Sequence, residues 1–422
     1  MTEPVSVIVL PQSRVRLHEM AIRQDGAEWI TGRLDTRRFV ALPRAGVVAI
    51  GLFQAGCTIE GTATEIAQTE RCTFDVLSFA RDLVALGFVA DIDGCPVACE
   101  PALPASLPRI RPEHVRFALS PVFPVLFGCL MMVATATLAL RPDLLPSFHQ
   151  LLWSPRGSSV LALSAGAGWM FVYVHELAHF ITARAAGVHA RIQLSTRLQF
   201  LTAETDISGI EFAPRSHRLT AYLAGMATNL SIAAVAILIQ ATTSPATTLH
   251  RILAATTVIA LMPLPFEFMV FMRTDVYYVL QDLLACRNLF GDGTAYARYL
   301  GNRLRHIVFR SAAGTVDPSF ILPQNERRAV RIYSVALVLG TLLCLAGMAT
   351  FTAPVDLMLI SHAVTRIGPG QSLITNLDSV VVLLILCSLH AAWTVTWWRR
   401  HGASIARWRQ SSRARGRGHG ST

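Results

Sequence analysis

The sequence is poor in charged residues and contains no lysine. Only 15% of its 422 residues are charged, and all 37 basic residues are arginine. A soluble domain normally carries about 25% charged residues, whereas 52% of this chain is hydrophobic and its mean hydropathy is +0.45. This composition excludes a wholly soluble protein. It predicts an integral membrane protein with room for one extra soluble domain.

Other features are missing as well. The first 40 residues lack a continuous apolar core, so we expect no signal peptide and an N-terminus in the cytoplasm. Cys95 and Cys99 have no second pair at zinc-finger spacing, so we expect no metal site there. The net charge of +10 fits arginine-rich cytoplasmic loops against anionic membrane lipids better than it fits a nucleic-acid surface.

The region before residue 113 is polar enough to fold as a soluble domain. Alternating residues over 28–42 predict a β-hairpin. Proline recurs between residues 96 and 112 and predicts a stiff linker, taken as 96–116. Helices are expected over 44–55, 62–69 and 73–86, the last capped by Thr73, with a strand over 88–91.

This order of strands, three short helices and a final strand, closed by Leu-Val-Ala-Leu-Gly-Phe-Val at 83–89, resembles the PqqD-like winged helix. The resemblance implies an α+β domain over 1–95 that recognises the leader of a precursor peptide. Another small α+β domain is the alternative.

Six apolar stretches follow, each near the ~20 residues that cross a bilayer as a helix. The segments 184–218, 273–331 and 399–422 hold 21 arginines, against 4 in the alternating segments. The positive-inside rule therefore places both termini in the cytoplasm of a multi-pass cell-membrane protein, with 399–422 as a basic tail. Within 117–398 the expected spans are 117–140, 159–183, 219–241, 252–272, 332–352 and 379–398.

The second apolar stretch contains His-Glu-Leu-Ala-His at 175–179. Residues four apart share a helix face, so His175 and His179 can bind one metal ion, and two imidazoles suit zinc. Glu176 can lean toward a zinc-held water and take its proton. Ionisable groups cost about 2.5–3.5 kcal/mol each inside a membrane, which favours a metal site over a chance motif.

A third ligand must come from elsewhere in the chain. The fourth stretch is broken by Pro263 and Pro265, and broken helices are tolerated where they line a cavity. Asp275 lies just beyond the break and is the expected ligand, although a helix cap or a partner for Arg273 is the plainer interpretation. The rival ligands are Glu267, Glu204, Asp206 and His189.

At this point a family resemblance emerges. His-Glu-Leu-Ala-His on a membrane helix, Leu-Ala-Gly-Met-Ala-Thr-Asn-Leu at 223–230 and the proline-broken helix ending Arg-Thr-Asp-Val-Tyr-Tyr together resemble the site-2-protease class. Thr-Asp-Ile-Ser at 205–208 and Arg-Ser-His-Arg-Leu at 215–219 make the bacterial peptide zinc metalloproteases the closest look-alikes. The resemblance covers roughly 115–330. It implies His175, His179 and Asp275 as zinc ligands, Glu176 as the base, and Gly225 and Asn229 near the site.

The chain departs from that pattern in backbone geometry rather than in ligands. Met226 stands where proline usually follows the glycine, and Val276 where glycine usually follows the aspartate. The asparagine that usually precedes the proline of the broken helix is also absent, at Met262 and Leu264. Asn229 could hydrogen-bond substrate or a developing oxyanion, or join two helices as a plain hydrogen bonder.

We therefore expect a mainly α, six-span intramembrane zinc metalloprotease with an N-terminal PqqD-like domain, which cleaves leader peptide from core in ribosomal or antimicrobial peptide maturation. Alternation over 191–210 predicts a hairpin whose edge binds substrate as an added strand. The arginines of 294–330 suit the inner membrane surface. The alternative function is a non-proteolytic scaffold or export factor for a modified peptide.

Overall fold

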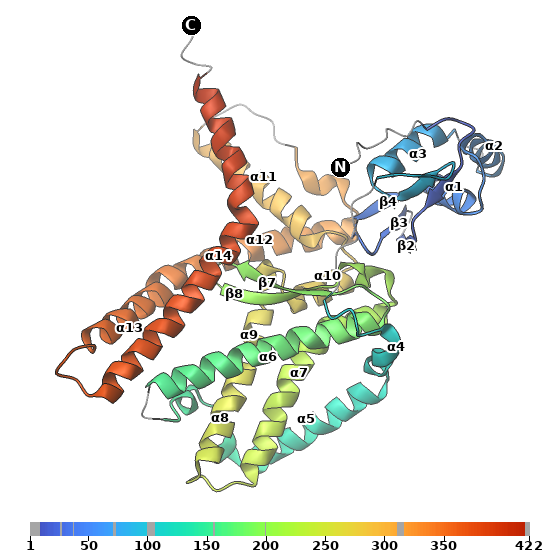
Figure 1. Cartoon of the computed structure of the whole chain (residues 1–422). Coiled ribbons are helices and arrows are strands. Elements are labelled where there is room, and N and C mark those ends of the chain that lie inside the picture. The colour runs from blue at the N-terminus through green and yellow to red at the C-terminus, as the bar shows by residue number, and fades with distance from the viewer. Residues whose placement is uncertain are drawn as a thin grey trace. The chain divides into compact units, whose positions relative to one another are not determined.

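The computed structural model describes residues 9–25, 28–36, 38–70, 73–98, 106–154, 157–198, 200–309 and 316–417. The fold is mainly helical, with small sheets near the N-terminus and six helices long and apolar enough to cross a membrane (Figure 1). This confirms the coarse prediction of a mainly α chain with six apolar helices, as expected of a multi-pass membrane protein. Cys72, Cys99 and the last five residues of the basic tail lie outside the described residues.

The chain divides into two compact units. The first contains Met1–Arg116 together with two short later segments, Ala183–Arg191 and Asp206–Arg218. The second contains the rest: Phe117–Thr182, Ile192–Thr205 and Leu219–Thr422.

The first unit contains two antiparallel three-stranded sheets. The predicted hairpin over 28–42 is confirmed, with Trp29 opposite Leu42. The sequence did not indicate the strand Ala21–Asp25 (β2), which pairs with Glu28–Arg33 (β3), because Ile22 is the only strongly strand-forming residue of β2. In one sheet the strand order is β2 (Ala21–Asp25), β3 (Glu28–Arg33), β4 (Arg38–Leu42). In the other sheet it is β1 (Val15–Leu17), β5 (Val89–Ile92), β6 (Cys95–Pro96).

Three helices complete this core. The prediction that Thr73 caps the third helix is wrong, because the Asp75 side chain accepts the Ser78 amide at 2.9 Å and the helix begins after it. The second helix begins earlier than expected because Thr58 caps it in the same way. The helices are α1 (Arg44–Gln54), α2 (Ile59–Thr69) and α3 (Val76–Ala85).

Of the two later segments of this unit, Asp206–Arg218 packs against the β2–β3–β4 sheet. The rings of Phe39 and Phe212 lie 5.2 Å apart, and the Arg23 guanidinium donates to the Glu211 carbonyl. A Cβ added at Gly209 would lie 2.7 Å from the Leu34 side chain, so the backbone approaches the strand connection closely.

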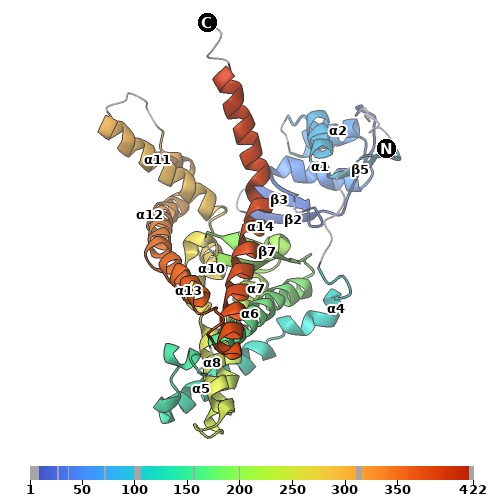
Figure 2. The ribbon, with the colours of Figure 1, turned by 60° about the vertical axis from the view of Figure 1, so that its left-hand side comes forward.

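The second unit holds the apolar helices (Figures 1 and 2). The fifth expected span, 332–352, does not end where predicted, because a π-helical turn at Met348–Thr352 carries α12 (Gln324–Gly347) directly into α13 (Ala353–Thr365). The resulting helix, Glu326–Thr365, has 40 residues. The helices are α5 (Val122–Leu140), α6 (Gly157–Ala185), α7 (Arg215–Ala241), α8 (Thr248–Leu261), α12 (Gln324–Gly347), α13 (Ala353–Thr365) and α14 (Leu373–Arg417).

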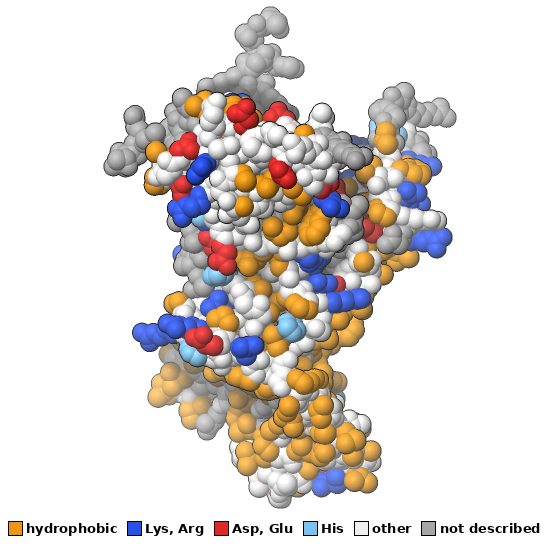
Figure 3. Space-filling view, turned by 90° about the vertical axis from the view of Figure 1, so that its right-hand side faces the viewer, with side chains coloured by type: hydrophobic (Ala, Val, Ile, Leu, Met, Phe, Trp, Pro, Cys, Tyr) orange, Lys and Arg blue, Asp and Glu red, His pale blue; other side chains and the backbone are white. Residues whose placement is uncertain are grey.

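Their outer surface is apolar. On α5, Val125, Met132 and Leu140 are 64%, 67% and 82% exposed. In the face shown in Figure 3, hydrophobic side chains cover the lower part of the view almost without charge. Exposed apolar surface of this extent marks contact with a membrane or a partner.

A small aromatic core joins the segments after the fourth apolar helix. In α10 (Asp275–Leu283), Tyr277 is buried and packs with Leu289 of α11 (Leu289–Phe309) and Tyr333 of α12. Much of the segment 294–330 thus belongs to α11, which packs along α12. Residues 310–315 of it lie outside the described residues.

The buried Arg33 in the first unit supplies a test of this fold. Its side chain is 4% exposed, donates to the Gly87 carbonyl at 2.6 Å and forms two hydrogen bonds with Asp35. Asp35→Asn removes the counter-charge, and we expect it to cost about 2 kcal/mol, less than a fully buried pair because Asp35 is partly exposed. Hydrogen exchange of β3 and β4 amides in the full-length protein should be roughly 30-fold faster.

The same pair predicts a pH dependence. The hydrogen bond from Arg33 lowers the pKa of Asp35 below its usual 3.8. Because the pKa of Asp35 is lower in the folded chain than in the unfolded chain, its contribution to the free energy of unfolding is complete above about pH 4. That contribution is lost as the pH falls through the folded pKa. As a control, Glu70→Gln breaks an ion pair whose Arg44 is 75% exposed, and it should change exchange little. Equal effects of the two variants would contradict this account.

Candidate metal centre

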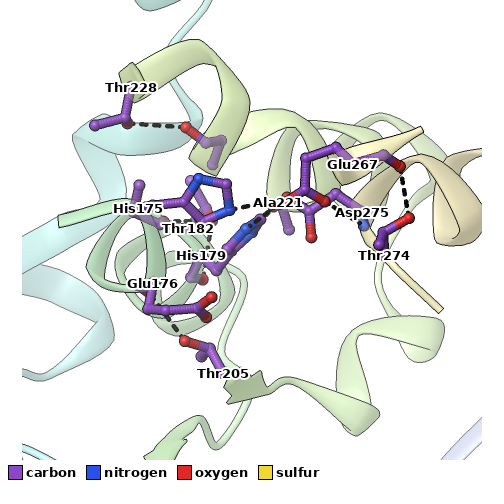
Figure 4. A network of polar contacts seen from close by, with 12 residues as sticks. His175, Glu176, His179, Thr182, Thr205, Ala221, Thr228, Glu267, Thr274 and Asp275 are labelled. Carbon is purple, nitrogen blue, oxygen red and sulfur yellow. Dashed lines mark hydrogen bonds and ion pairs between the residues drawn. The ribbon is translucent and has the colours of Figure 1, made fainter. Parts of the chain in front are cut away.

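Helix α6 places His175 and His179 together. Both side chains come from successive turns of one face, and their ring centroids are 4.9 Å apart. The residues are 6% and 4% exposed, so both imidazoles are buried. Figure 4 shows the two rings side by side.

Asp275, the first residue of α10, joins the two histidines. Its Oδ2 lies 3.1 Å from His175 Nε2 and 2.9 Å from His179 Nε2. The three potential ligand atoms all lie within 4.8 Å of one another. The structure thus brings together the three residues that the sequence nominated. Within the described part of the chain, the rivals Glu204, Asp206, His189 and Glu267 do not join this group.

The broken fourth helix explains how Asp275 reaches the histidines. Pro263 and Pro265 cannot donate backbone hydrogen bonds, and α8 gives way there to the four-residue helix α9 (Leu264–Glu267). A 3₁₀ turn follows, and Arg273 then takes a left-handed conformation with φ 59° and ψ 51°. This reverses the chain and starts α10 at the level of the two imidazoles.

Glu267, considered above as a possible ligand, instead lies beside the centre and accepts hydrogen bonds from neighbouring residues. Its carboxylate Oε2 accepts the Asp275 backbone N–H at 2.9 Å, and its backbone carbonyl accepts the Thr274 hydroxyl at 2.5 Å (Figure 4). Backbone groups freed by the helix break are thereby satisfied inside the apolar region. Glu267 thus fixes the position of Asp275.

The aromatic core holds α10 from its other side. The Tyr277 hydroxyl accepts the Phe290 amide at 3.0 Å, and the Tyr333 hydroxyl donates to the Val270 carbonyl at 3.1 Å. Both tyrosines are almost fully buried. Residues before and after Asp275 are therefore tied to α11 and α12.

The hydrogen bonding of His179 leaves two acceptor atoms facing each other at the centre. His179 Nδ1 lies 2.6 Å from the Ala221 carbonyl, which can only accept, so Nδ1 carries the proton. His179 Nε2 then presents a lone pair to Asp275 Oδ2 at 2.9 Å. Two facing acceptors repel unless a proton or a metal ion lies between them. His179 Nε2 and His175 Nδ1 are buried without a hydrogen-bond partner among the described residues, and the set fits a metal ion.

Gly225 of α7 allows the two helices to approach at His175. A Cβ added there would lie 2.3 Å from His175 Nε2, closer than any side chain can tolerate. Ala221 and Asn229 are buried one turn to either side of Gly225. Small residues at such spacing let membrane helices pack closely. Met226, despite departing from the family pattern, leaves this contact intact.

Asn229 is 1% exposed, yet neither its amide nitrogen nor its oxygen has a hydrogen-bond partner within the described chain. Among the described residues, this side chain therefore forms no interhelical hydrogen bond. A buried polar group without a partner costs about 1–3 kcal/mol.

Glu176 lies between the histidines in sequence and is 9% exposed. Its carboxylate forms no ion pair with any other described residue. Its backbone carbonyl accepts the Thr205 hydroxyl at 2.9 Å. Thr205 belongs to β8 (Phe200–Asp206), which forms the predicted hairpin with β7 (Arg191–Arg197), so the hairpin is pinned to the motif helix.

Sequence reasoning did not find the supporting contacts of Ala221 and Thr205. A backbone carbonyl leaves no sequence signal, so the Ala221 contact could not be found. Thr205 begins a motif noted above, Thr-Asp-Ile-Ser, but only the fold brings its hydroxyl to α6.

Comparisons of the chain with protein-family models, with curated proteins and with solved structures return no match.

Gly225→Ala tests the close approach of α7 to His175. The added methyl would displace the imidazole, so we expect bound metal to fall about 10- to 100-fold in affinity. Metal content of the purified full-length protein, measured with and without a chelator, would show it. Gly166→Ala on α6 is the control, because no atom lies within 4 Å of that position. Full metal retention by Gly225→Ala would contradict the geometry.

Glu267 is tested by two substitutions. Glu267→Ala removes the acceptor of the Asp275 amide and should weaken metal binding by about 10- to 100-fold. Glu267→Gln keeps a carbonyl oxygen for the same N–H, and we expect near-normal affinity in a chelator competition. If the Gln variant binds as poorly as the Ala variant, the carboxylate itself is a ligand and the positioning role is wrong.

Proposed function

We propose that the protein is an intramembrane zinc metalloprotease that cleaves the leader from a precursor peptide. The observation that carries this is the His175–His179–Asp275 group on apolar helices, with the unpaired Glu176 between the two histidines. Two imidazoles and one carboxylate match the ligand types of catalytic zinc sites, which keep a fourth position open.

The residues divide into distinct tasks. His175, His179 and Asp275 would hold the zinc ion, which when bound supplies a Lewis acid that polarises a carbonyl and acidifies water. Glu176 would take the proton of the attacking water and pass it to the leaving amine. The unpartnered Asn229 amide would donate to the carbonyl oxygen as negative charge develops on it.

The hairpin supports a peptide substrate. An extended peptide can add to the edge of a small sheet as a further strand. Because Thr205 of β8 is bonded to the backbone of Glu176, a peptide along this edge would lie beside the catalytic helix. An extended chain also exposes its amide to attack, which a helix does not.

The first unit supports the choice of a leader-bearing precursor. Its strands and three helices keep the order on which the PqqD-like resemblance rests, and we propose that it binds the leader. The arginine distribution places this unit, both termini and the hairpin on the cytoplasmic side of the cell membrane. The partners are then the precursor peptide and membrane lipids.

Glu176→Gln is the decisive test. It keeps the side-chain size and removes the proton acceptor, and general-base catalysis typically contributes about 10²–10⁴-fold. We expect near-complete loss of leader cleavage with metal content and folding retained. Unprocessed precursor should accumulate at the membrane, which immunoblotting of membrane fractions would detect.

His175→Ala is the companion variant and should lose both metal and cleavage. Normal mature peptide in a Glu176→Gln strain that has no other protease of this type would refute the enzymatic function. A scaffold or export factor would then be the better description, since neither role requires Glu176 as a base.

A further inference from the structure

A second site lies near the candidate centre. An open cavity of about 370 Å³ is lined by the β7–β8 hairpin, the 3₁₀ turn before Arg273, and α10, α11, α12 and α14. The hairpin contributes Arg197 and Glu204, and the opposite wall contributes Arg273, Tyr278 and Phe290. None of these side chains is needed for the metal chemistry described above.

The charge of the cavity is positive. Two guanidinium groups, Arg197 and Arg273, face one carboxylate, Glu204, among its lining residues. Neither arginine forms an ion pair in the described part of the chain, although Arg273 lies over the Phe290 ring at 5.3 Å. Arginine is the preferred partner for a carboxylate, because its planar group can donate two parallel hydrogen bonds.

Arg273 has an unusual backbone for a charged residue. Its φ of 59° lies in the left-handed region that glycine adopts without cost. Such backbone strain costs about 1–3 kcal/mol per residue and clusters at functional sites. In the described chain the left-handed residues other than glycine are Asp93, Leu107, Leu198, Arg273 and Ala285, and two of them, Leu198 and Arg273, line this cavity.

The cavity adjoins the centre through a short chain of contacts. Arg273 stands two residues before Asp275. The Tyr278 ring stacks on Tyr222 at 5.7 Å, and Tyr222 follows Ala221, whose carbonyl fixes His179. A peptide held at the centre can therefore place a nearby side chain in the cavity.

We propose that this cavity is a specificity subsite for an acidic side chain of the peptide substrate, held by Arg197 and Arg273. The proposal rests on the proposed peptidase function. A peptide is favoured over a lipid headgroup because the hairpin proposed to hold the extended substrate itself supplies Arg197 to the wall. The rings of Tyr278 and Phe290 would pack against the methylene groups of that side chain.

The test measures binding without cleavage. Full-length Glu176→Gln protein in phosphatidylcholine nanodiscs is titrated with fluorescent acetylated octapeptides of alanine, leucine and phenylalanine. One position at a time carries Glu or the neutral isostere Gln. At one position the Glu peptide should bind about 10-fold more tightly, the usual worth of a charge-assisted hydrogen bond. Arg197→Gln should abolish that preference.

Matched variants separate the outcomes. Arg191→Gln, at the other end of β7 and outside the cavity lining, should keep the preference. Arg273→Gly removes the second charge while tolerating the backbone conformation, and it should weaken the preference with metal content unchanged. Equal binding of Glu and Gln peptides at every position would overturn the proposal.

Two further results discriminate among causes. If phosphatidylglycerol in the nanodiscs removes the preference through Arg197, the site binds lipid phosphate and the peptide subsite is refuted. Cleavage is measured separately with the wild-type protein. Peptides that are cut without an acidic preference would refute only the subsite, whereas an Arg197-dependent preference without any cleavage would refute only the protease.

Discussion

A helix that breaks inside apolar surroundings must satisfy the backbone groups that the break releases. Here Glu267 does so, accepting the Asp275 amide with its carboxylate and the Thr274 hydroxyl with its carbonyl. Those bonds hold Asp275 in place, and Asp275 completes the candidate ligand group with His175 and His179. In the sequence, Glu267 and Asp275 both look like possible ligands. In the structure, the Glu267 carboxylate accepts a backbone N–H, whereas the Asp275 carboxylate faces the two histidines.

The sequence predicted what depends on local pattern. Helical spacing was enough to place His175 and His179 on one face, and two prolines were enough to indicate a break before Asp275. The sequence could not decide between Asp275 and Glu267 as the third ligand. That choice depends on the chain reversal at Arg273, whose left-handed backbone conformation has no signal in the sequence. The contact of Gly225 with His175 likewise requires the packing of two helices, which a single sequence does not encode visibly.

The corrections share a physical origin. Thr73 and Asp75 are both good caps, and the choice between them follows from which side chain meets a free amide, here that of Ser78. The fifth apolar stretch was expected to end at residue 352, but a π-turn at Met348–Thr352 lets the helix continue to Thr365. Composition describes the average environment of a segment, whereas hydrogen bonding decides its conformation.

The long helix Glu326–Thr365 has a mechanical consequence. Forty residues of helix extend about 60 Å, twice the ~30 Å hydrocarbon thickness of a bilayer. An upright helix of this length would reach beyond the hydrocarbon layer, so it must tilt, bend at its π-turn or extend outside the layer. Its first two turns carry Glu326, Arg327, Arg328 and Arg331, so the excess length belongs at that polar end, next to Tyr333, whose hydroxyl holds the Val270 carbonyl.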